Sequence, residues 1–269
     1  MDRRRLTYLE RLGIPVYVPR DAGVADVLEL EPEAPPPEAK AQATPEAGPE
    51  TVETPGGAPV ADHPPPPLDW EALRGEVAGC QRCRLCQGRT QTVFGVGDPR
   101  ADLVVVGEGP GREEDRRGEP FVGPAGQLLD EMLLAIGRGR ERGGVYIANV
   151  VKCRPPGNRE PRSDEVAECA GYLRAQLALI QPRVVVAVGR VAAQSLLGSA
   201  EPLARLRQRV HSFPMGHHGA GEEAATVPLW VTYHPAYLLR SPADKAKAWQ
   251  DLKRIRAALE PPAPAADPA

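Results

Sequence analysis

Three of the five cysteines in this chain, Cys80, Cys83 and Cys86, lie within seven residues, in the run GCQRCRLCQG. Two cysteines separated by two residues can bind one metal centre from a single turn of the chain. This spacing does not decide whether Cys80 with Cys83 or Cys83 with Cys86 forms the chelating pair. Cys153 lies among basic residues that favour its thiolate, and Cys169 lies on the apolar face of an expected helix. Four thiolates from these two groups can bind zinc or an iron–sulfur cluster.

The cysteine pattern leaves other chemistry open. A zinc ribbon favours a second pair of cysteines separated by two residues, and the chain has none. Cys169 is equally compatible with an ordinary buried cysteine. The chain carries an odd number of cysteines and begins without a secretory signal, which argues against a disulfide framework.

Three polar clusters follow apolar segments that we expect to be strands. The first is GEGPGREEDRRGEPF at 107–121, the second is Asn149 followed by KCRPPGNR, and the third is Tyr233-His234-Pro235. In open α/β sheets, ligands bind beyond the carboxyl ends of the strands. We therefore expect carboxylates, an amide, an aromatic ring and an imidazole around one crevice.

Each cluster also has a purely structural interpretation. The GEGPG run can be a tight turn in which glycine accommodates positive φ, and it has neither the dinucleotide nor the P-loop spacing. Asn149 can be a core amide with satisfied hydrogen bonds. His234 can be a helix cap or a surface residue. The remaining histidines fall in expected loops and suggest no chemistry; they are His63, His211, His217 and His218.

The elements that must position these residues follow from hydrophobic periodicity. Helices are expected at 69–79, 124–136, 164–180, 190–197 and 243–258, with Ser163 as the N-cap of the third. Strands are expected at 102–107, 145–151, 183–188 and 229–233. All-apolar strands that alternate with amphipathic helices indicate a mostly parallel sheet covered on both faces. The predicted fold is a three-layer α/β/α domain with a central, mostly parallel four-stranded sheet.

Composition divides the 269 residues into four segments. We expect a short N-terminal segment at 1–24, a disordered Pro/Glu-rich linker at 25–67, one domain at 68–259 and a disordered tail at 260–269. Residues 26–67 contain nine acidic residues and one lysine, so the rest of the chain carries a net charge of +5 although the whole carries −3. A basic domain is compatible with a polyanionic partner. No apolar run approaches the roughly 20 residues of a membrane span, so we expect a cytoplasmic protein without membrane contact.

Three long motifs stand out along the chain: CQRCRLCQGRTQTVFGVGDPRADLVVVGEGPGREEDRRGEPFVGPAGQLL, YIANVVKCRPPGNREP and TYHPAYLLRSP. These motifs resemble those of the family 4 uracil-DNA glycosylases, which are base-excision-repair enzymes with a 4Fe–4S cluster. They follow one another in order within residues 70–258, whereas residues 1–67 lie outside the resemblance. The resemblance implies that a 4Fe–4S cluster is bound by Cys80, Cys83, Cys153 and Cys169. Cys86 then falls where relatives can carry a residue that is not a ligand.

The same resemblance implies a role for each polar cluster. Phe121 would stack on a uracil flipped out of the DNA, and Asn149 would bind its N3/O4 edge. Glu114 would exclude the methyl group of thymine, and Gly109 would line the pocket with Glu108. His234 would donate to uracil O2 while negative charge develops on the departing base. The water-activating residue is not identified; Glu108 and Glu114 are candidates, as is stabilisation of the oxocarbenium by the site and the DNA phosphates. No lysine nucleophile signature is present, so we expect a monofunctional enzyme.

Contacts with DNA are also implied by the family. The stretch PAYLLRSP would enter the duplex, where Leu238 or Leu239 would fill the space of the flipped base and Arg240 would approach the phosphates. Its structural alternative is an ordinary connection whose leucines pack inward. The basic residues expected to bind phosphates are Lys152, Arg154 and Arg159.

Two other functions stay open at this point. One is a catalytically weak or covalent uracil-DNA-binding relative, which the lack of an inserted histidine in REEDRRGEPFVG disfavours. The other is a metal-bearing nucleotide-binding module. Hypoxanthine or xanthine excision remains open as a side activity. The expected partner is uracil-containing DNA, single- or double-stranded, and a repair or replication partner bound through the N-terminal segment is a further hypothesis. We expect a monomer.

Overall fold

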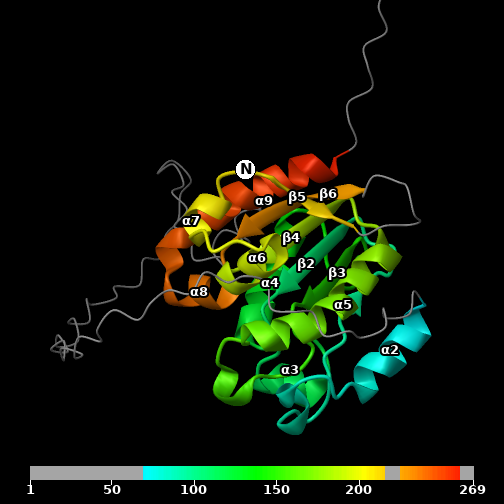
Figure 1. Cartoon of the computed structure of the whole chain (residues 1–269). Helices are drawn as coiled ribbons and strands as arrows, with labels where there is room; N and C mark the ends of the chain where they lie inside the picture. The colour runs from blue at the N-terminus through cyan, green and yellow to red at the C-terminus, as the bar shows by residue number, and fades with distance from the viewer. Residues whose placement is uncertain (1–68, 216–224, 261–269) are drawn as a thin grey trace, which may run out of the picture.

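The computed structural model describes residues 69–215 and 225–260, which form a six-stranded sheet between two layers of helices (Figure 1). Four parallel strands form its centre, and every residue of the first three in chain order is buried, as expected for strands covered on both faces. Across the sheet these strands are β3 (Val145–Asn149), β2 (Leu103–Gly107), β4 (Val184–Val188) and β6 (Thr226–Thr232). Because β3 and β4 flank β2, the strand order reverses there, which creates a crevice at the carboxyl ends.

Two short antiparallel strands extend the parallel centre at its edges. β1 (Val96–Gly97) pairs with β3, and β5 (His211–Pro214) pairs with β6. The predicted four-stranded sheet is therefore confirmed as the centre of a larger, mixed sheet. Neither edge strand has the all-apolar pattern of the central ones, so hydrophobic periodicity does not reveal them.

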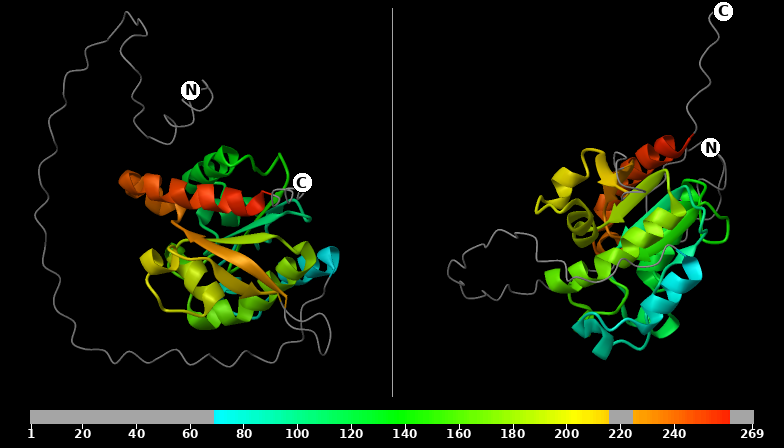
Figure 2. Two further views of the ribbon diagram at one scale, coloured as in Figure 1. Left: turned by 90° about the horizontal axis from the view of Figure 1, so that it is seen from above. Right: turned by 45° about the vertical axis from the view of Figure 1, so that its right-hand side comes forward.

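Helices cover both faces of this sheet, which confirms the three-layer prediction. Figure 2 shows the two helical layers on opposite sides of the strands. One apolar core lies under α2 (Trp70–Gly79), α5 (Ser163–Ile180), α6 (Arg190–Leu197) and α7 (Leu203–Leu206). The second lies under α4 (Pro124–Ala135), α8 (Pro235–Arg240) and α9 (Lys245–Leu259). The shorter helical segments are η1 (Arg84–Gln87), α3 (Arg112–Arg117), η2 (Pro156–Asn158) and η3 (Pro242–Asp244).

The predicted element boundaries agree with these bounds to within a few residues, with one wrong cap. Ser163 is the first residue of α5 rather than its N-cap, which is Arg162. The Glu165 carboxylate accepts a hydrogen bond from the Arg162 backbone N–H at 2.8 Å. A carboxylate in the first turn therefore satisfies a backbone donor at this terminus, the function expected of a serine hydroxyl.

Several predicted segments lie outside the described residues. These are the N-terminal segment 1–24, the Pro/Glu-rich segment 25–67, residues 261–269 of the tail, and the loop that contains His217 and His218. Among the helices in 69–215 and 225–260, none has both the length and the apolar character needed to cross a bilayer.

Candidate active site and cysteine cavity

A pocket opens at the carboxyl ends of the four parallel strands, and each strand contributes to its wall. Residues that end or follow these strands line it: Glu108 and Gly109 after β2, Asn149 at the end of β3, Gly189 and Arg190 after β4, and Tyr233 and His234 after β6. Glu114, Phe121, Arg159 and Arg240 complete much of the rest. The structure therefore brings the three predicted polar clusters together around one crevice.

Asn149 lies at the buried end of this pocket. Its side chain is 2% exposed, and within the described residues its Oδ1 atom has no hydrogen-bond partner. Gly107 lies opposite Asn149 in the β2–β3 register, and a Cβ atom at position 107 would collide with both Oδ1 and the Phe121 ring. An unpaired buried acceptor is unfavourable by about 1–3 kcal/mol. The geometry is that of an amide kept ready for a ligand donor.

Phe121 faces His234 across the pocket, with ring centroids 5.6 Å apart. Its backbone has a φ of 54°, a conformation that costs energy in residues other than glycine. Arg140 holds this turn, because its guanidinium donates to the Phe121 carbonyl at 2.6 Å and to the Pro120 carbonyl at 2.7 Å. Asp130 in turn fixes Arg140 through a 2.7 Å ion pair.

Glu114 fastens the same turn from the side of α3. Its Oε1 accepts from the Val122 and Gly123 backbone N–H groups at 3.0 and 3.2 Å, and its Oε2 accepts from the Gly111 N–H at 3.1 Å. Both carboxylate oxygens are thus bound to backbone donors. This arrangement suits a rigid wall of the pocket better than a base that must accept a proton.

Glu108 is the pocket carboxylate with a strongly altered proton affinity. Burial, with a smaller contribution from the like charge of Glu160, raises the pKa of Glu108 to about 7, and Arg190 opposes the shift. Arg190 forms an ion pair with Glu160 at the same side of the pocket. A carboxylate with a pKa near neutrality can exchange a proton under physiological conditions.

His234 is both the N-cap of α8 and a pocket residue. Its Nδ1 accepts a hydrogen bond from the Ala236 backbone N–H at 3.1 Å, so the structural interpretation as a helix cap is confirmed. Burial lowers the pKa of His234 to about 4, with a further lowering by Arg240 and an opposing effect of Glu114. The imidazole is therefore neutral at pH 7. Because Nδ1 accepts, the ring proton resides on Nε2, which is left as a donor.

The residues predicted to bind DNA separate into two groups. Arg159 and Arg240 line the pocket, Arg154 is bonded to Asn158 at 2.7 Å, and Leu239 is 44% exposed on α8. All four lie on accessible parts of the domain and remain candidates for DNA contact.

Two residues of that set are contradicted by the structure. Lys152 is 1% exposed, and its Nζ is hydrogen-bonded inside the protein, so it cannot reach a phosphate. Leu238 is 1% exposed and packs in the core beneath α8, so it is not available to enter a duplex. Both errors have one cause: adjacent residues point in different directions, and the sequence does not show which one faces outward.

Sequence reasoning missed several residues of the pocket. Glu160 and Arg190 flank Glu108, and Tyr237 on α8 stacks on Tyr233 with ring centroids 5.2 Å apart. The rule that ligands bind at the carboxyl ends of strands also applies to Gly189-Arg190 after β4, and it would have identified Arg190. Glu160 and Tyr237 lie further from a strand end and gave no comparable signal.

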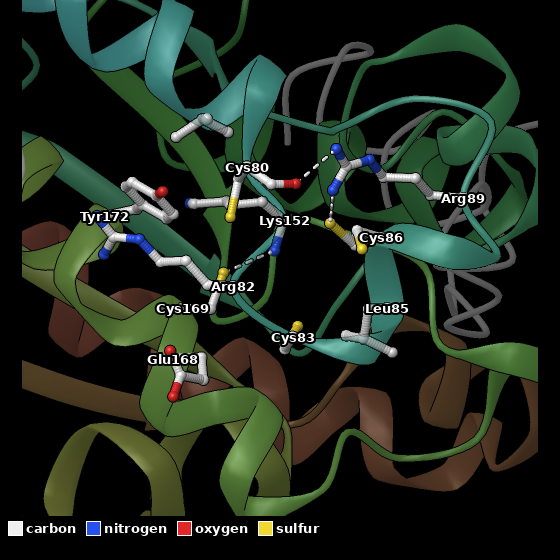
Figure 3. Close-up of a pocket in the computed structure, with 12 residues that line it drawn as sticks. Cys80, Arg82, Cys83, Leu85, Cys86, Arg89, Lys152, Glu168, Cys169 and Tyr172 are labelled. Carbon is white, nitrogen blue, oxygen red and sulfur yellow. Dashed lines mark hydrogen bonds between the residues drawn. The ribbon is translucent and has the colours of Figure 1, made fainter. Parts of the chain in front are cut away.

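A second cavity contains the thiols of all five cysteines. It is lined by Cys80, Cys83, Cys86, Cys153 and Cys169, together with Arg89, Lys152 and Tyr172 (Figure 3). Residues 80–86 and the two later cysteines are thus brought together from distant parts of the chain. Cys86, which the resemblance separates from the ligands, lies in the wall of the same cavity.

A guanidinium and a backbone N–H donate to these thiols, and the carboxylate Glu168 also lines the cavity. The Arg89 guanidinium donates to Cys153 Sγ at 3.0 Å and to the Cys80 carbonyl at 2.8 Å, and the Lys152 backbone N–H donates to Cys169 Sγ at 3.3 Å. Burial raises the pKa of Cys83 to about 11 and that of Cys169 to about 12. A bound metal must therefore displace thiol protons before these residues act as ligands.

The donor set of the cavity consists of thiols from three segments of the chain, and thiolates are the ligands of iron–sulfur clusters. In 69–215 and 225–260, no three cysteine, histidine or carboxylate side chains converge as closely as one metal ion requires. In a cubane cluster each iron at a corner takes one thiolate, so the four sulfur atoms surround a group and need not meet at one point. Thiols that line a common cavity without meeting are consistent with that geometry.

Comparison with known proteins assigns the fold and the pocket to a class. Residues 94–253 match the model of the uracil DNA glycosylase superfamily. The type-4 uracil-DNA glycosylase of Archaeoglobus fulgidus is 42% identical over 184 residues, which cover 67% of this chain and 88% of that protein. That of Thermotoga maritima is 38% identical over 71% of this chain and 94% of that protein. The type-5 enzyme of Thermus thermophilus is 34% identical over 55% and 71%. The chain therefore belongs to the uracil-DNA glycosylase superfamily and, within it, to the type-4 family.

Proposed function

We propose that this chain is a monofunctional uracil-DNA glycosylase of base-excision repair. It hydrolyses the N-glycosidic bond of deoxyuridine in DNA, releases uracil and leaves an abasic site. The glycosylase activity follows from membership of the type-4 family. The choice of base is supported by the Oδ1 atom of Asn149, which is buried at the end of the pocket and has no hydrogen-bond partner among the described residues. Incubation of the protein with a uracil-containing oligonucleotide tests this proposal. It should release free uracil and leave a strand that breaks only after alkali, because a monofunctional enzyme leaves the backbone intact.

The uracil-binding roles follow from complementary hydrogen bonds. Asn149 accepts from uracil N3–H through Oδ1 and donates to O4 through its amide nitrogen. Cytosine has an acceptor at N3 and a donor at position 4, so the same amide orientation is mismatched to it. Phe121 stacks on the flipped base, and the wall formed by Gly109 and by Glu114 with its bound turn limits the space beside uracil C5, which excludes thymine.

Bond cleavage places negative charge on the departing uracil. The Nε2–H group of His234 donates to O2 as this charge develops, in the manner of an oxyanion hole. A neutral Nε2–H donor suits this role, because its hydrogen bond strengthens as O2 becomes anionic, so the transition state is bound more tightly than the neutral base. Glu108, whose pKa is about 7, is the better of the two carboxylates for accepting a proton from water. Glu114 acts through the turn that it holds.

Contacts to DNA surround the pocket mouth. Arg159, Arg240 and Arg154 supply positive charge for phosphates. Leu239 is an exposed apolar side chain on the helix that His234 caps, and it fills the space that the flipped nucleotide leaves.

An iron–sulfur cluster is the group that best fits the cysteine cavity. Cys80, Cys83, Cys153 and Cys169 would hold a 4Fe–4S cluster, which would supply a structural crosslink rather than a reacting group. The shared cavity of these thiols and the guanidinium that donates to one of them support this assignment. Iron and sulfide analysis of serine variants tests it. Each of the four variants should lose iron, whereas Cys86→Ser should retain it. Full iron content in Cys169→Ser would contradict the ligand set.

A further inference from the structure

Lys152 is a buried cation with no role in the site described above. Its Nζ donates to the main-chain oxygen of Asn149 at 3.0 Å and to Oε1 of Gln176 at 2.7 Å. The Gln176 amide donates in turn to the Phe94 carbonyl at 2.8 Å and to the Tyr146 hydroxyl at 3.1 Å. The group that holds Nζ is therefore itself fixed in the core.

Glu168 is the carboxylate that lines the cysteine cavity, but the hydrogen bonds of Lys152 Nζ go to a main-chain oxygen and to an amide oxygen. Lys152 takes part in none of the ion pairs within residues 69–215 and 225–260. Both acceptors of Nζ are neutral. A buried ammonium is strongly unfavourable unless an anion compensates it.

Two thiols lie next to Lys152 in the chain or in contact with its backbone, and both can become anionic. Cys153 is the next residue, and the Lys152 backbone N–H donates to Cys169 Sγ at 3.3 Å. All three residues line the cysteine cavity, in which Figure 3 labels Lys152 and Cys169. Burial lowers the pKa of Lys152 to about 8, and negative charge on Cys169 or Cys153 opposes that shift. Thiols become thiolates when they bind a metal centre. The missing negative charge is thus available from the cavity itself.

We propose that Lys152 is the counter-ion of the cluster-binding thiolates and a positioning residue for Asn149, so that an occupied cysteine cavity stabilises the uracil-binding wall of the pocket. This inference rests on the iron–sulfur centre proposed above. The connection is short, because one side chain joins the cavity to the carbonyl of the residue that reads the base. Negative charge on the thiolates compensates the Lys152 ammonium, so the ammonium stays buried and its hydrogen bond to the Asn149 carbonyl is maintained.

Two substitutions at this position separate charge from packing. Lys152→Met retains the apolar stem without the charge, and Lys152→Arg retains the charge in a larger shape. Cluster-loaded proteins are compared by midpoint potential, by the rate of iron loss to a chelator, and by KM and kcat for uracil excision. Lys253→Met, on the exposed face of α9, serves as a surface control.

The counter-ion role predicts a more negative midpoint potential in the methionine variant, because a nearby positive charge favours the reduced cluster. It also predicts iron loss that is faster by on the order of 10–100-fold, together with a raised KM. The midpoint potential of the arginine variant should lie closer to that of the wild type than the midpoint potential of the methionine variant does. An unchanged potential and unchanged iron retention in Lys152→Met would overturn the proposal, as would an arginine variant more altered than the methionine variant.

A measurement on the wild-type protein does not depend on the folding of either variant. Acetic anhydride labelling, read residue by residue by mass spectrometry, should modify Lys152 much faster after the cluster is removed than before. Equal protection of Lys152 in both states would contradict the counter-ion role. Absence of iron and sulfide from protein purified without oxygen would instead refute the proposed cluster, so the two failures are distinguishable.

Discussion

The two ring nitrogens of His234 serve different purposes, and this difference defines its chemistry. Nδ1 accepts the Ala236 N–H and so caps α8, which leaves the proton on Nε2 inside the pocket. Burial keeps the pKa of the ring at about 4, so the donor stays neutral throughout the physiological range. Capping and donation are therefore two separable properties of one side chain.

Two substitutions separate these properties. His234→Ala removes both the cap and the donor, whereas His234→Asn retains a residue favoured at N-caps. We expect kcat for uracil excision to fall by on the order of 10²–10³ in both variants, because neither has the imidazole Nε2–H and the shorter asparagine amide does not reach its position. Only the alanine variant should also lose about 1 kcal/mol in the free energy of unfolding. Near wild-type kcat in His234→Asn would show that the ring acts solely as a cap.

The proton affinity of Glu108 predicts a pH dependence. As a base, Glu108 must be ionised, so kcat/KM should rise with pH through about 7, the pKa of the free enzyme. Glu160→Gln removes a like charge that raises this pKa, and the rising limb should therefore move to lower pH. Glu108→Gln should abolish the limb. A profile unaffected by either substitution would assign the base role elsewhere.

At the scale of elements, the turn that carries Phe121 depends on close packing against α4. A Cβ atom on Gly126, in the first turn of α4, would collide with the Phe121 main-chain carbonyl. The positive φ of Phe121 also requires support from its surroundings, which Arg140 and Glu114 provide. The stacking ring is thus positioned by backbone contacts rather than by its own preference.

Two glycine substitutions test this packing, because both glycines lie in helices. Gly126→Ala should lower the free energy of unfolding by about 1–3 kcal/mol through overpacking and should raise KM. Gly75→Ala is the matched control: its Cβ would have no atom within 4 Å, and it should stabilise α2 by about 0.5–1 kcal/mol. Chemical denaturation measures both. A Gly126→Ala protein as stable as wild type would contradict the close approach.

The sequence predicts strongly periodic elements well and isolated side-chain directions poorly. The strands β2, β3 and β4 can be predicted from their apolar sequences, because burial on both faces removes polar residues from a strand. An asparagine that follows such an apolar run, as Asn149 does in β3, is for the same reason expected at the strand end. The burial of Lys152 was not predictable, since a lysine beside Arg154 suggests a charged surface. Its environment is formed by Gln176, which is distant in sequence.

At the scale of the whole molecule, α8 joins the pocket to the proposed DNA-binding surface through two adjacent leucines with opposite environments. Leu238 is 1% exposed and Leu239 is 44% exposed. Leu239→Ala should reduce excision from duplex DNA more than from single strands, because only the duplex leaves a gap to fill, and should leave stability unchanged. Leu238→Ala should lower the free energy of unfolding by about 2–5 kcal/mol. Equal losses on both substrates in Leu239→Ala would remove the insertion role.

Residues 80–90, which include Cys80, Cys83 and Cys86, are also connected to the pocket by hydrogen bonds that do not involve Lys152. The buried Asp115 side chain on α3 accepts hydrogen bonds from the backbone N–H of Thr90 at 2.9 and 3.1 Å. Its neighbour Glu114 holds the Phe121 turn. From the sequence alone, these cysteines form an isolated metal-binding motif. In the tertiary structure, the same segment also supports the candidate active site.

The most direct test of the proposed uracil recognition is the single-turnover rate of uracil excision, measured for the wild type, Asn149→Ala and Gln208→Ala on one uracil-containing oligonucleotide. Gln208 is an exposed amide that is not among the residues lining the pocket, so its variant controls for general effects of losing an amide side chain. We predict rapid formation of alkali-labile sites by the wild type and by Gln208→Ala. We predict a rate lower by on the order of 10²–10³ for Asn149→Ala. Wild-type rates in Asn149→Ala, or no excision by iron-loaded wild-type protein, would contradict the proposed uracil recognition.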